Sequence, residues 1–322
     1  MPPFILHHPV SIAEATQIAS ELIESGEDFD WVAGGTDVLP NYKWRINPKP
    51  HVISLAKIPE ANHVTQYEIG CMTKLSSLTE ENGVHPLIVE AASKIASSLI
   101  RNSATVGGNL CLDTRCFWYN QSEDWRRSID WCHKADCGTG ADCRVIPNQN
   151  TLCVATYQGD LAPNFMALGA TVTLIGPQGD RTIPLTEFYQ LDGMKKNVLQ
   201  PGEFMLKVTL PQDAYEYDGS YQKLRLRESW DFPEAGITAV WKKGDYSSLK
   251  IASTALESIP KIHGEQVDEF VEKWEKGSTI PLLSEAIRRS VKPVNNTALP
   301  PNYRRSVVRV LAKRALKNIG CE

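Results

Sequence analysis

The stretch "FDWVAGGTDVLP", residues 29–40, gives the clearest early indication of how this chain folds. Its apolar beginning, Phe29 to Ala33, is typical of a short buried strand, and the paired Gly34 and Gly35 end that strand in a tight turn. Glycine has no Cβ, so backbone N–H groups in such a turn can approach an anion closely. The stretch therefore predicts a strand followed by a candidate phosphate-binding turn.

A second glycine pair lies in "IRNSATVGGNL", residues 100–110. It follows an apolar helical pattern that begins at Pro86, and the pattern predicts one helix over residues 86–102. Two such turns could hold the two phosphates of a dinucleotide. Neither turn has the G-x-G-x-x-G fingerprint, and paired glycines also occur in turns that bind nothing. The residues alone leave both interpretations open.

The rest of the N-terminal part alternates between helical and strand patterns. Ser11 and Glu14 have capping-box spacing before a helical stripe over residues 12–25. The remaining strand patterns include one hairpin around a Gly and Pro turn. Strands are predicted at residues 51–58, 67–72, 170–176, 179–185 and 203–211.

A polar, turn-rich segment, "DAYEYDGS", places a domain boundary near residue 216. Three strand patterns follow it and precede helices that end with "NYRRSVVRVLAKRALKN", residues 302–318. The fold class predicted is α+β, with a first domain over residues 1–215 and a smaller second domain over residues 216–322. The second domain is expected to hold a three-stranded sheet and helices.

Composition limits the possible functions. The chain has 322 residues, a net charge of -4 and a pI near 6.0, and its Lys and Arg residues are scattered. This gives no basic field for nucleic acid. No window approaches the roughly 18 apolar residues of a membrane span, and the N-terminus lacks a signal-peptide pattern. We expect a cytoplasmic protein with neither nucleic acid nor membrane as a partner.

The cysteines are unevenly distributed. Six of the eight lie between Cys111 and Cys153, in a segment of about 40 residues that has neither helix nor strand periodicity. Five aromatic residues in the same segment argue against disorder. In a reducing compartment such a group of thiols more often binds metal than forms disulfides. We therefore predict an insert at about residues 111–155 that is ordered around a metal centre.

The cysteine spacing is C-x4-C-x15-C-x4-C-x5-C-x9-C. A structural zinc site usually has closely paired ligands, and no C-x2-C pair occurs here. A four-iron cluster can be held by four thiolates from a wide loop, so the pattern favours an iron–sulfur cluster while zinc stays open. Isolated Cys71 and Cys321 are expected to be free buried thiols.

The ordered motifs together resemble a known family. "VAGGTDVLPNYK", "IRNSATVGGNL", "GDLAPNFMALGATVTLIG", "LQPGEFMLKVTLP" and "YQKLRLRESWDFPEAGI" resemble, in this order, the FAD-carrying medium subunit of the xanthine oxidase family of molybdenum enzymes. The resemblance covers most of the chain. It implies a two-lobed FAD-binding domain of the vanillyl-alcohol-oxidase-like (PCMH) type followed by a smaller α+β domain.

The same resemblance implies which residues bind FAD. It assigns two glycine turns to the pyrophosphate, a carboxylate to the adenosine side and a few later residues to the flavin lining. The implied residues are Ala33, Gly34, Gly35, Thr36, Asp37 and Val38 for the first turn, Thr105, Gly107, Gly108 and Asn109 for the second, Asp160 for the carboxylate, and Val198, Leu199 and Lys223 for the lining.

The long insert, with "CLDTRC", "YNQSE" and "GDLAP", resembles that of the β subunits of 4-hydroxybenzoyl-CoA reductases. The resemblance implies a [4Fe-4S] cluster, and it implies Cys116, Cys132, Cys143 and Cys153 as ligands. Cys137 is a rival of Cys143, and Cys111 is a spare thiol.

The implied activity is electron relay, with substrate chemistry in a partner subunit and no catalytic residue in this chain. Electrons would run from reduced ferredoxin, via [4Fe-4S] and FAD, to a small subunit with two [2Fe-2S] clusters and a large molybdenum-cofactor subunit. There 4-hydroxybenzoyl-CoA would lose its hydroxyl reductively, in anaerobic aromatic degradation. A dimer of heterotrimers is the implied assembly. The alternatives are a related hydroxylase subunit that passes electrons outward to NAD or another acceptor, and a zinc-stabilised non-redox scaffold.

Overall fold

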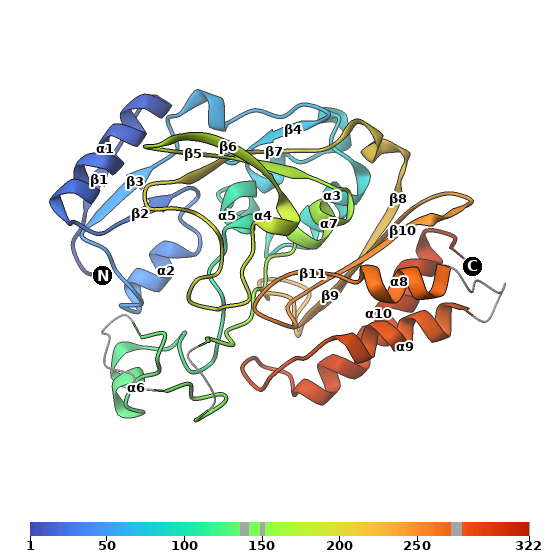
Figure 1. Ribbon diagram of the computed structural model, residues 1–322. Coiled ribbons are helices and arrows are strands. Elements are labelled where there is room, and N and C mark those ends of the chain that lie inside the picture. The colour runs from blue at the N-terminus through green and yellow to red at the C-terminus, as the bar shows by residue number, and fades with distance from the viewer. Residues whose placement is uncertain (136–141, 149–151, 272–278, 322) are drawn as a thin grey trace.

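The computed structural model describes residues 1–322 except 136–141, 149–151, 272–278 and 322, and its described strands form three sheets (Figure 1). The strands are β1 (Ile5–His7), β2 (Phe29–Val32), β3 (His51–Ser54), β4 (Glu68–Gly70), β5 (Thr171–Gly176), β6 (Gly179–Pro184), β7 (Phe204–Thr209), β8 (Asp218–Leu224), β9 (Ala235–Lys242), β10 (Asp245–Thr254) and β11 (Lys261–Ile262). The α-helices are α1 (Ile12–Ser25), α2 (Val38–Lys43), α3 (Pro86–Ser93), α4 (Ser98–Arg101), α5 (Val106–Leu110), α6 (Glu123–Ser128), α7 (Ala162–Ala167), α8 (Gly264–Val271), α9 (Thr279–Ser290) and α10 (Pro301–Asn318). Short 3-10 turns lie at Pro59–Ala61, Leu75–Ser77, Glu80–Asn82, Leu185–Glu187 and Gln212–Glu216.

The first sheet is parallel, in the order β1-β3-β2, and α1 lies beside it (Figure 1). The predicted helix over residues 12–25 is confirmed, and Ser11 caps it by accepting a hydrogen bond from the Glu14 amide at 3.2 Å. Ala19 and Leu22 of the helix pack with Ile53 of β3 in one small core. The helix therefore covers this sheet through its apolar stripe.

The second sheet is antiparallel, in the order β4-β7-β5-β6. Strand β5 alternates between buried and half-buried residues, so one face meets the largest core of the chain. The predicted hairpin is present as β5 and β6, paired from Thr171 with Pro184 to Gly176 with Gly179.

The predicted single helix over residues 86–102 is wrong. The chain forms α3, breaks after Ser93 and resumes as the one-turn α4. Ala96 has a left-handed backbone with φ of 44°, and Ser97 then caps α4 by accepting from the Ile100 amide at 3.3 Å. Such a residue interrupts a right-handed helix, and the apolar periodicity carries no signal of it.

The third sheet, in the order β11-β10-β9-β8, corrects the expectation of three strands in the C-terminal part. The extra strand, β11, pairs antiparallel with β10 and has only two residues, which is too short for a periodic pattern. Helices α8, α9 and α10 pack on this sheet around a second large core. Among the described residues, no helix combines the length and apolarity needed to cross a membrane.

The cysteine-rich insert forms a lobe below α2 in Figure 1 and contains α6. From their charge alone, Asp124, Arg126, Arg127 and Asp130 of the insert are expected to form a solvated face, but Arg126 is only 1% exposed. The guanidinium donates to the carbonyls of Gln121 at 2.6 Å, Arg45 at 2.7 Å and Trp44 at 3.3 Å. Arg126 therefore fastens the insert to the end of α2.

The two stems of the insert are joined by Asn296, which lies after α9 in the C-terminal part. Its backbone carbonyl accepts from the Phe117 amide at 2.9 Å, and its side-chain amide donates to the Val154 carbonyl at 2.7 Å. Its side-chain oxygen also accepts from the Thr156 hydroxyl at 3.1 Å. Between them, Arg115 and Thr156 exchange both backbone hydrogen bonds at 2.7 Å. The insert thus begins and ends at one fixed place.

Candidate functional site

The two glycine turns predicted to bind phosphate lie against each other. A Cβ placed on Gly34 would lie 1.9 Å from the backbone oxygen of Ser103, just before the second turn. A Cβ on Gly107 would lie 2.5 Å from the Cβ of Cys71. Gly35 has a φ of 69°, which favours glycine. The glycines are therefore required for the close approach of backbone segments that are distant in sequence.

A cavity of about 820 Å³ opens beside these turns. This volume is within the range of cofactor sites. The cavity is bordered by both glycine turns, by the carboxylate implied for the adenosine side and by one residue of the later lining. The residues of the expected site that line it are Ala33, Gly34, Gly35, Thr36, Asp37, Val38, Thr105, Gly107, Gly108, Asn109, Asp160 and Leu199.

Gly108 shows that the cavity reaches the backbone of the second turn. Thr105 Oγ1 accepts from the Gly108 amide at 3.1 Å and so fixes that peptide. A Cβ on Gly108 would meet only this oxygen at 3.1 Å and the Ala33 Cβ at 3.9 Å. A side chain there would fill the space between the two turns. The two turns thus form a cradle that suits the pyrophosphate of a dinucleotide.

Two residues of the expected site, Val198 and Lys223, are not part of the cavity lining. Lys223 is instead buried against Asp160, with 3.0 Å between the ammonium and a carboxylate oxygen, and it also donates to the Lys94 carbonyl at 2.9 Å. Tyr221 donates to Asp160 at 2.7 Å. Burial raises the pKa of Asp160, and the charge of Lys223 opposes that rise. Lys223 therefore holds the carboxylate that lines the cavity.

Sequence patterns did not identify the C-terminal contribution to this cavity. Trp230, Asp231 and Phe232, in the loop between β8 and β9, line it. Arg115 stacks on the Phe232 ring, with 4.6 Å from its guanidinium carbon to the ring centre, and is ion-paired with Asp37. The Arg115 link ties the first glycine turn to the loop. The segment containing these residues was quoted for its family resemblance, but no local pattern reveals that contact.

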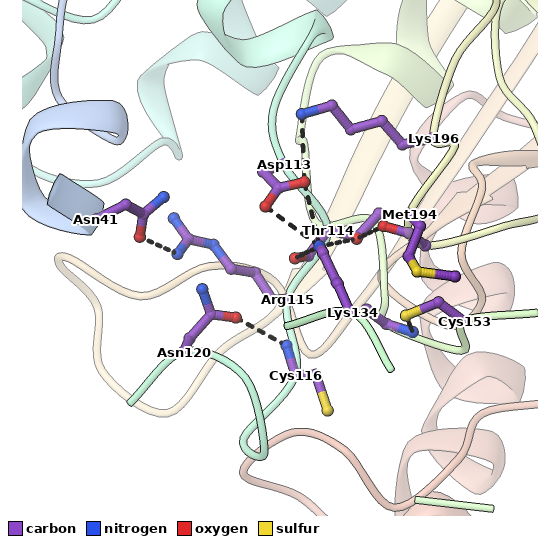
Figure 2. Close-up of polar contacts among 12 residues, drawn as sticks. Asn41, Asp113, Thr114, Arg115, Cys116, Asn120, Lys134, Cys153, Met194 and Lys196 are labelled. Atoms are coloured by element: carbon purple, nitrogen blue, oxygen red, sulfur yellow. Dashed lines mark hydrogen bonds and ion pairs between the residues drawn. The ribbon is translucent and has the colours of Figure 1, made fainter. Parts of the chain in front are cut away.

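A second missed feature is a partly buried charge cluster in the cavity wall, formed by Asp113, Lys134 and Lys196 (Figure 2). Each ammonium lies 3.2 Å from a carboxylate oxygen of Asp113. Burial alone would raise the pKa of Asp113, but the two lysines lower it to about 2. The cluster therefore carries one negative and two positive charges at neutral pH. These residues are far apart in sequence, so spacing could not group them.

The structure brings the four expected metal-binding cysteines together. Cys116, Cys132, Cys143 and Cys153 are 6–8% exposed and line one small cavity with Trp118 and Val145 among its apolar borders. The space left at its centre is about 10 Å³, so a four-iron core would require the side chains to rotate outward. Four thiols from one loop, shielded by aromatic residues, match the donor chemistry of such a core.

Among the described residues, no three Cys, His, Asp or Glu side chains lie close enough to hold one metal ion as they stand. The four thiols would therefore have to move to bind either a single ion or a cluster.

Burial keeps the thiols of Cys116, Cys132 and Cys153 protonated in the absence of a cation. It raises the pKa of Cys116 to about 12 and that of Cys153 to about 11, and it also raises the pKa of Cys132. The charges of the neighbouring thiols contribute to the rise, because the sites lie close together. Metal binding would replace the protons.

The other cysteines lie elsewhere. Cys71 and Cys111 line the large cavity, so Cys111 is separate from the cavity of the four cysteines. Cys321 is buried in the C-terminal core. Cys137, the rival ligand, lies outside the described residues. His133 borders both cavities, and its Nε2 is buried without a hydrogen-bond partner in the described structure.

The cavities share a wall. Tyr119, His133 and Lys134 line both the large cavity and the cysteine cavity. All three residues come from the insert. A cofactor in each cavity would therefore contact the same short segment, and the pair of cavities is suited to hold two redox groups as neighbours.

A cavity with two glycine turns and a buried carboxylate defines a dinucleotide-binding protein, and comparison with known families specifies it further. Residues 2–213 match the family described as the FAD binding domain in molybdopterin dehydrogenase. The chain belongs to this family and is therefore a FAD-binding oxidoreductase subunit of the molybdenum hydroxylase type.

Similar proteins support this membership. The chain is 25% identical to the carbon monoxide dehydrogenase medium chain of Hydrogenophaga pseudoflava, over 98% of this chain and 96% of that protein. It is 29% identical to the aldehyde oxidoreductase FAD-binding subunit of Escherichia coli, over 65% of this chain and 70% of that one.

Solved structures show the same fold. A carbon monoxide dehydrogenase from Hydrogenophaga pseudoflava that lacks the Mo-pyranopterin moiety superposes with a TM-score of 0.77 at 23% identity, over 99% of this chain and 98% of that one. Quinoline 2-oxidoreductase from Pseudomonas putida 86 gives a TM-score of 0.76 at 17% identity, over 99% of this chain and 98% of that one. The expected two-part α+β architecture is thus found in proteins of this type.

Proposed function

We propose that this chain is the FAD- and [4Fe-4S]-binding electron-relay subunit of a molybdenum enzyme that resembles 4-hydroxybenzoyl-CoA reductase. The observation that carries the proposal is the pair of adjoining cavities. One cavity has the glycine turns of a FAD site, and the other collects four buried thiols. Two redox groups in one chain are suited to passing electrons.

The residues of the large cavity would hold FAD in defined ways. Backbone amides at Gly34 and Gly35 would bind the pyrophosphate, and Asp160 would accept hydrogen bonds from the adenosine sugar. Lys223 would keep that carboxylate ionised and oriented, because it is paired with it at 3.0 Å. Leu199 would lie along the flavin, whereas Val198 is outside the cavity lining.

Cys116, Cys132, Cys143 and Cys153 would bind the [4Fe-4S] cluster, and Trp118 would shield it from water. When bound, FAD exchanges electrons in pairs or singly, and the cluster exchanges them one at a time. The contribution of the protein is to hold both groups at a common wall and to exclude solvent from the thiolates.

The direction of electron flow follows from the insert. A cluster beside the flavin offers an entry for a low-potential donor, so we propose reduced ferredoxin as donor and a partner molybdenum subunit as the destination. A small subunit with two [2Fe-2S] clusters would lie between them. The assembly would be a cytoplasmic dimer of heterotrimers that removes the hydroxyl of 4-hydroxybenzoyl-CoA reductively, as part of anaerobic aromatic degradation.

The first experiment counts cofactors in the anaerobically purified chain. We expect about four iron atoms and one FAD per chain, no zinc, and an EPR signal that appears on reduction. Zinc without iron would contradict the relay and favour the scaffold alternative. The intact complex is then assayed with reduced ferredoxin and hydroxybenzoyl-CoA isomers, and loss of the hydroxyl group is measured.

A second candidate function is outward electron flow to NAD or another acceptor. The relatives named above are a carbon monoxide dehydrogenase chain and an aldehyde oxidoreductase subunit, and these names describe enzymes that oxidise substrates. If the complex reduces NAD when it oxidises an aldehyde or a related substrate, and does not act on hydroxybenzoyl-CoA, this second function replaces the first.

A further inference from the structure

The shared wall between the two cavities contains a lysine. Lys134 lines the large cavity and the cysteine cavity, and its side chain is only 7% exposed. In Figure 2 its ammonium points toward Asp113 and Thr114. The charge is thus placed within the protein at the border of two proposed redox groups.

The position of this ammonium is fixed by several partners. It lies 3.2 Å from both carboxylate oxygens of Asp113, and it donates to the Thr114 carbonyl at 3.0 Å and to Thr114 Oγ1 at 2.7 Å. The Thr114 hydroxyl donates to the Gly193 carbonyl at 2.6 Å, which leaves its lone pairs for Lys134. The ammonium also lies 4.7 Å from the centre of the Tyr119 ring.

Lys196 belongs to the same group of charged residues as Lys134 and Asp113, and it provides a matched comparison with Lys134. Its ammonium is also 3.2 Å from Asp113, and its residue lines the large cavity. It is not part of the lining of the cysteine cavity. The two lysines thus share the Asp113 carboxylate, but Lys134 lines both cavities whereas Lys196 lines only the large one. Together the three residues carry a net charge of one positive.

We propose that Lys134 is a positioning residue that sets the reduction potential of the cluster in the cysteine cavity, with Asp113 holding its charge in place. This rests on the proposed function, because it requires a cluster there. A reduced cluster carries one more negative charge than an oxidised cluster, and a fixed positive charge nearby stabilises the reduced form. The buried position limits screening by water and salt. Lys134 therefore makes the cluster easier to reduce by its electron donor.

The test is a redox titration of the purified, cofactor-loaded chain, with the cluster followed by EPR and the flavin by absorbance. Lys134→Met lowers the midpoint potential of the cluster, and we expect at least a tenfold change in its reduction equilibrium, about 59 mV for one electron. Lys134→Arg retains the charge and largely restores the parental value. Lys196→Met shifts the flavin and leaves the cluster within a few-fold of the parental equilibrium.

Asp113→Asn should shift the midpoint potential of the iron–sulfur cluster in the direction opposite to Lys134→Met. Removal of its negative charge leaves two positive charges near the cavities, so the cluster potential rises. A merely structural role would disturb the cluster in the same direction in both variants, whereas an electrostatic role moves the potential in opposite directions. If Lys134→Met loads too little iron, the comparison of Lys134→Arg with Asp113→Asn still measures the electrostatic effect.

The two proposals fail in different ways. A wild-type chain with FAD and without iron contradicts the proposed function itself. A chain that holds iron and FAD in all variants, with a cluster potential that is unchanged in Lys134→Met and Asp113→Asn, contradicts only the role of Lys134.

Discussion

The two cavities of this protein are built in different ways. The large cavity is formed by backbone turns and side chains from segments spread over the chain, from Asp30 to Phe232. The described residues that line the cysteine cavity lie between Cys116 and Ala155, all in one insert. The first site is thus a product of the whole fold, whereas the second is carried by one local segment. The two cavities meet at their shared wall, which residues of the insert form.

This difference predicts that the sites can be lost separately. A change to the backbone contact between the glycine turns should remove FAD and spare the metal centre. A change within the insert should do the reverse. The first three predictions below test that separation, and the fourth concerns the stability of the fold outside both cavities.

The largest effect is expected for the cysteine ligands. Cys116→Ser combined with Cys153→Ser should reduce iron from about four atoms per chain to less than one, because a hydroxyl is a poor ligand for iron–sulfur clusters. FAD content, measured by absorbance after release, should stay near one. Cys321→Ser is the control, since Cys321 is buried in the C-terminal core. Loss of FAD together with iron would show that the sites are not separable.

The next effect is expected at the contact of the glycine turns. Gly34→Ala places a methyl group against the backbone oxygen of Ser103, at 1.9 Å without relaxation. Backbone must move, so we expect loss of bound FAD and a destabilisation of about 1–3 kcal/mol, with iron retained. FAD content and urea unfolding measure the two effects. Gly264→Ala is the control, because a Cβ there meets nothing within 4 Å.

A smaller effect is expected at the anchor of the insert. Arg126→Met removes the guanidinium from three backbone carbonyls, and we expect a local destabilisation of about 1–3 kcal/mol. Iron should be lost to a chelator severalfold faster, while FAD is retained. Arg127→Met, whose side chain is 63% exposed, should change the rate little. Equal rates for the two variants would contradict the anchoring role of Arg126.

The smallest effect concerns a group remote from both cavities. Burial lowers the pKa of His263 to about 3, and its ring bonds Ser253 and Ser290 at 2.9 Å. Between about pH 6.5 and pH 3 the unfolded chain binds a proton that the folded chain does not, so stability falls as pH falls. From pH 7.5 to 5.5 the loss should be about 1 kcal/mol.

Urea unfolding of the wild-type chain and of His263→Gln at both pH values measures this loss. The glutamine variant should lack the His263 share of the loss. If both chains lose equal stability, His263 is not its source. Cofactor release between pH 7.5 and 5.5, compared between the same two chains, shows how much of the release follows from lost fold stability rather than from changes in either cavity.

Much of this architecture could be predicted from the sequence, because regular elements leave periodic signals. The helix at residues 12–25 and the hairpin at residues 170–185 follow from apolar spacing and turn residues. The break at Ala96 was missed because a single left-handed residue changes no periodicity. Strand β11 was missed because two residues form no pattern.

The parts of each site that are marked by local sequence patterns could be predicted, whereas the parts that come together only on folding could not. Glycine pairs and clustered cysteines are visible locally, so both glycine turns and the cysteine-rich insert could be named. The partners of those residues could not, because the pairing of Lys223 with Asp160 and of Lys196 with Asp113 depends on the folded chain. Arg126 was assigned to the surface because its charge was considered without the three carbonyls that it meets.

The link made by Asn296 has a consequence for protein engineering. Its side-chain amide and backbone carbonyl hold both stems of the insert from a point more than 140 residues farther along the chain than Val154. A graft of the insert into a homologous subunit would therefore need more than the loop itself. The recipient would also need an asparagine at the matching position, so the transplantable unit is a loop together with one distant residue.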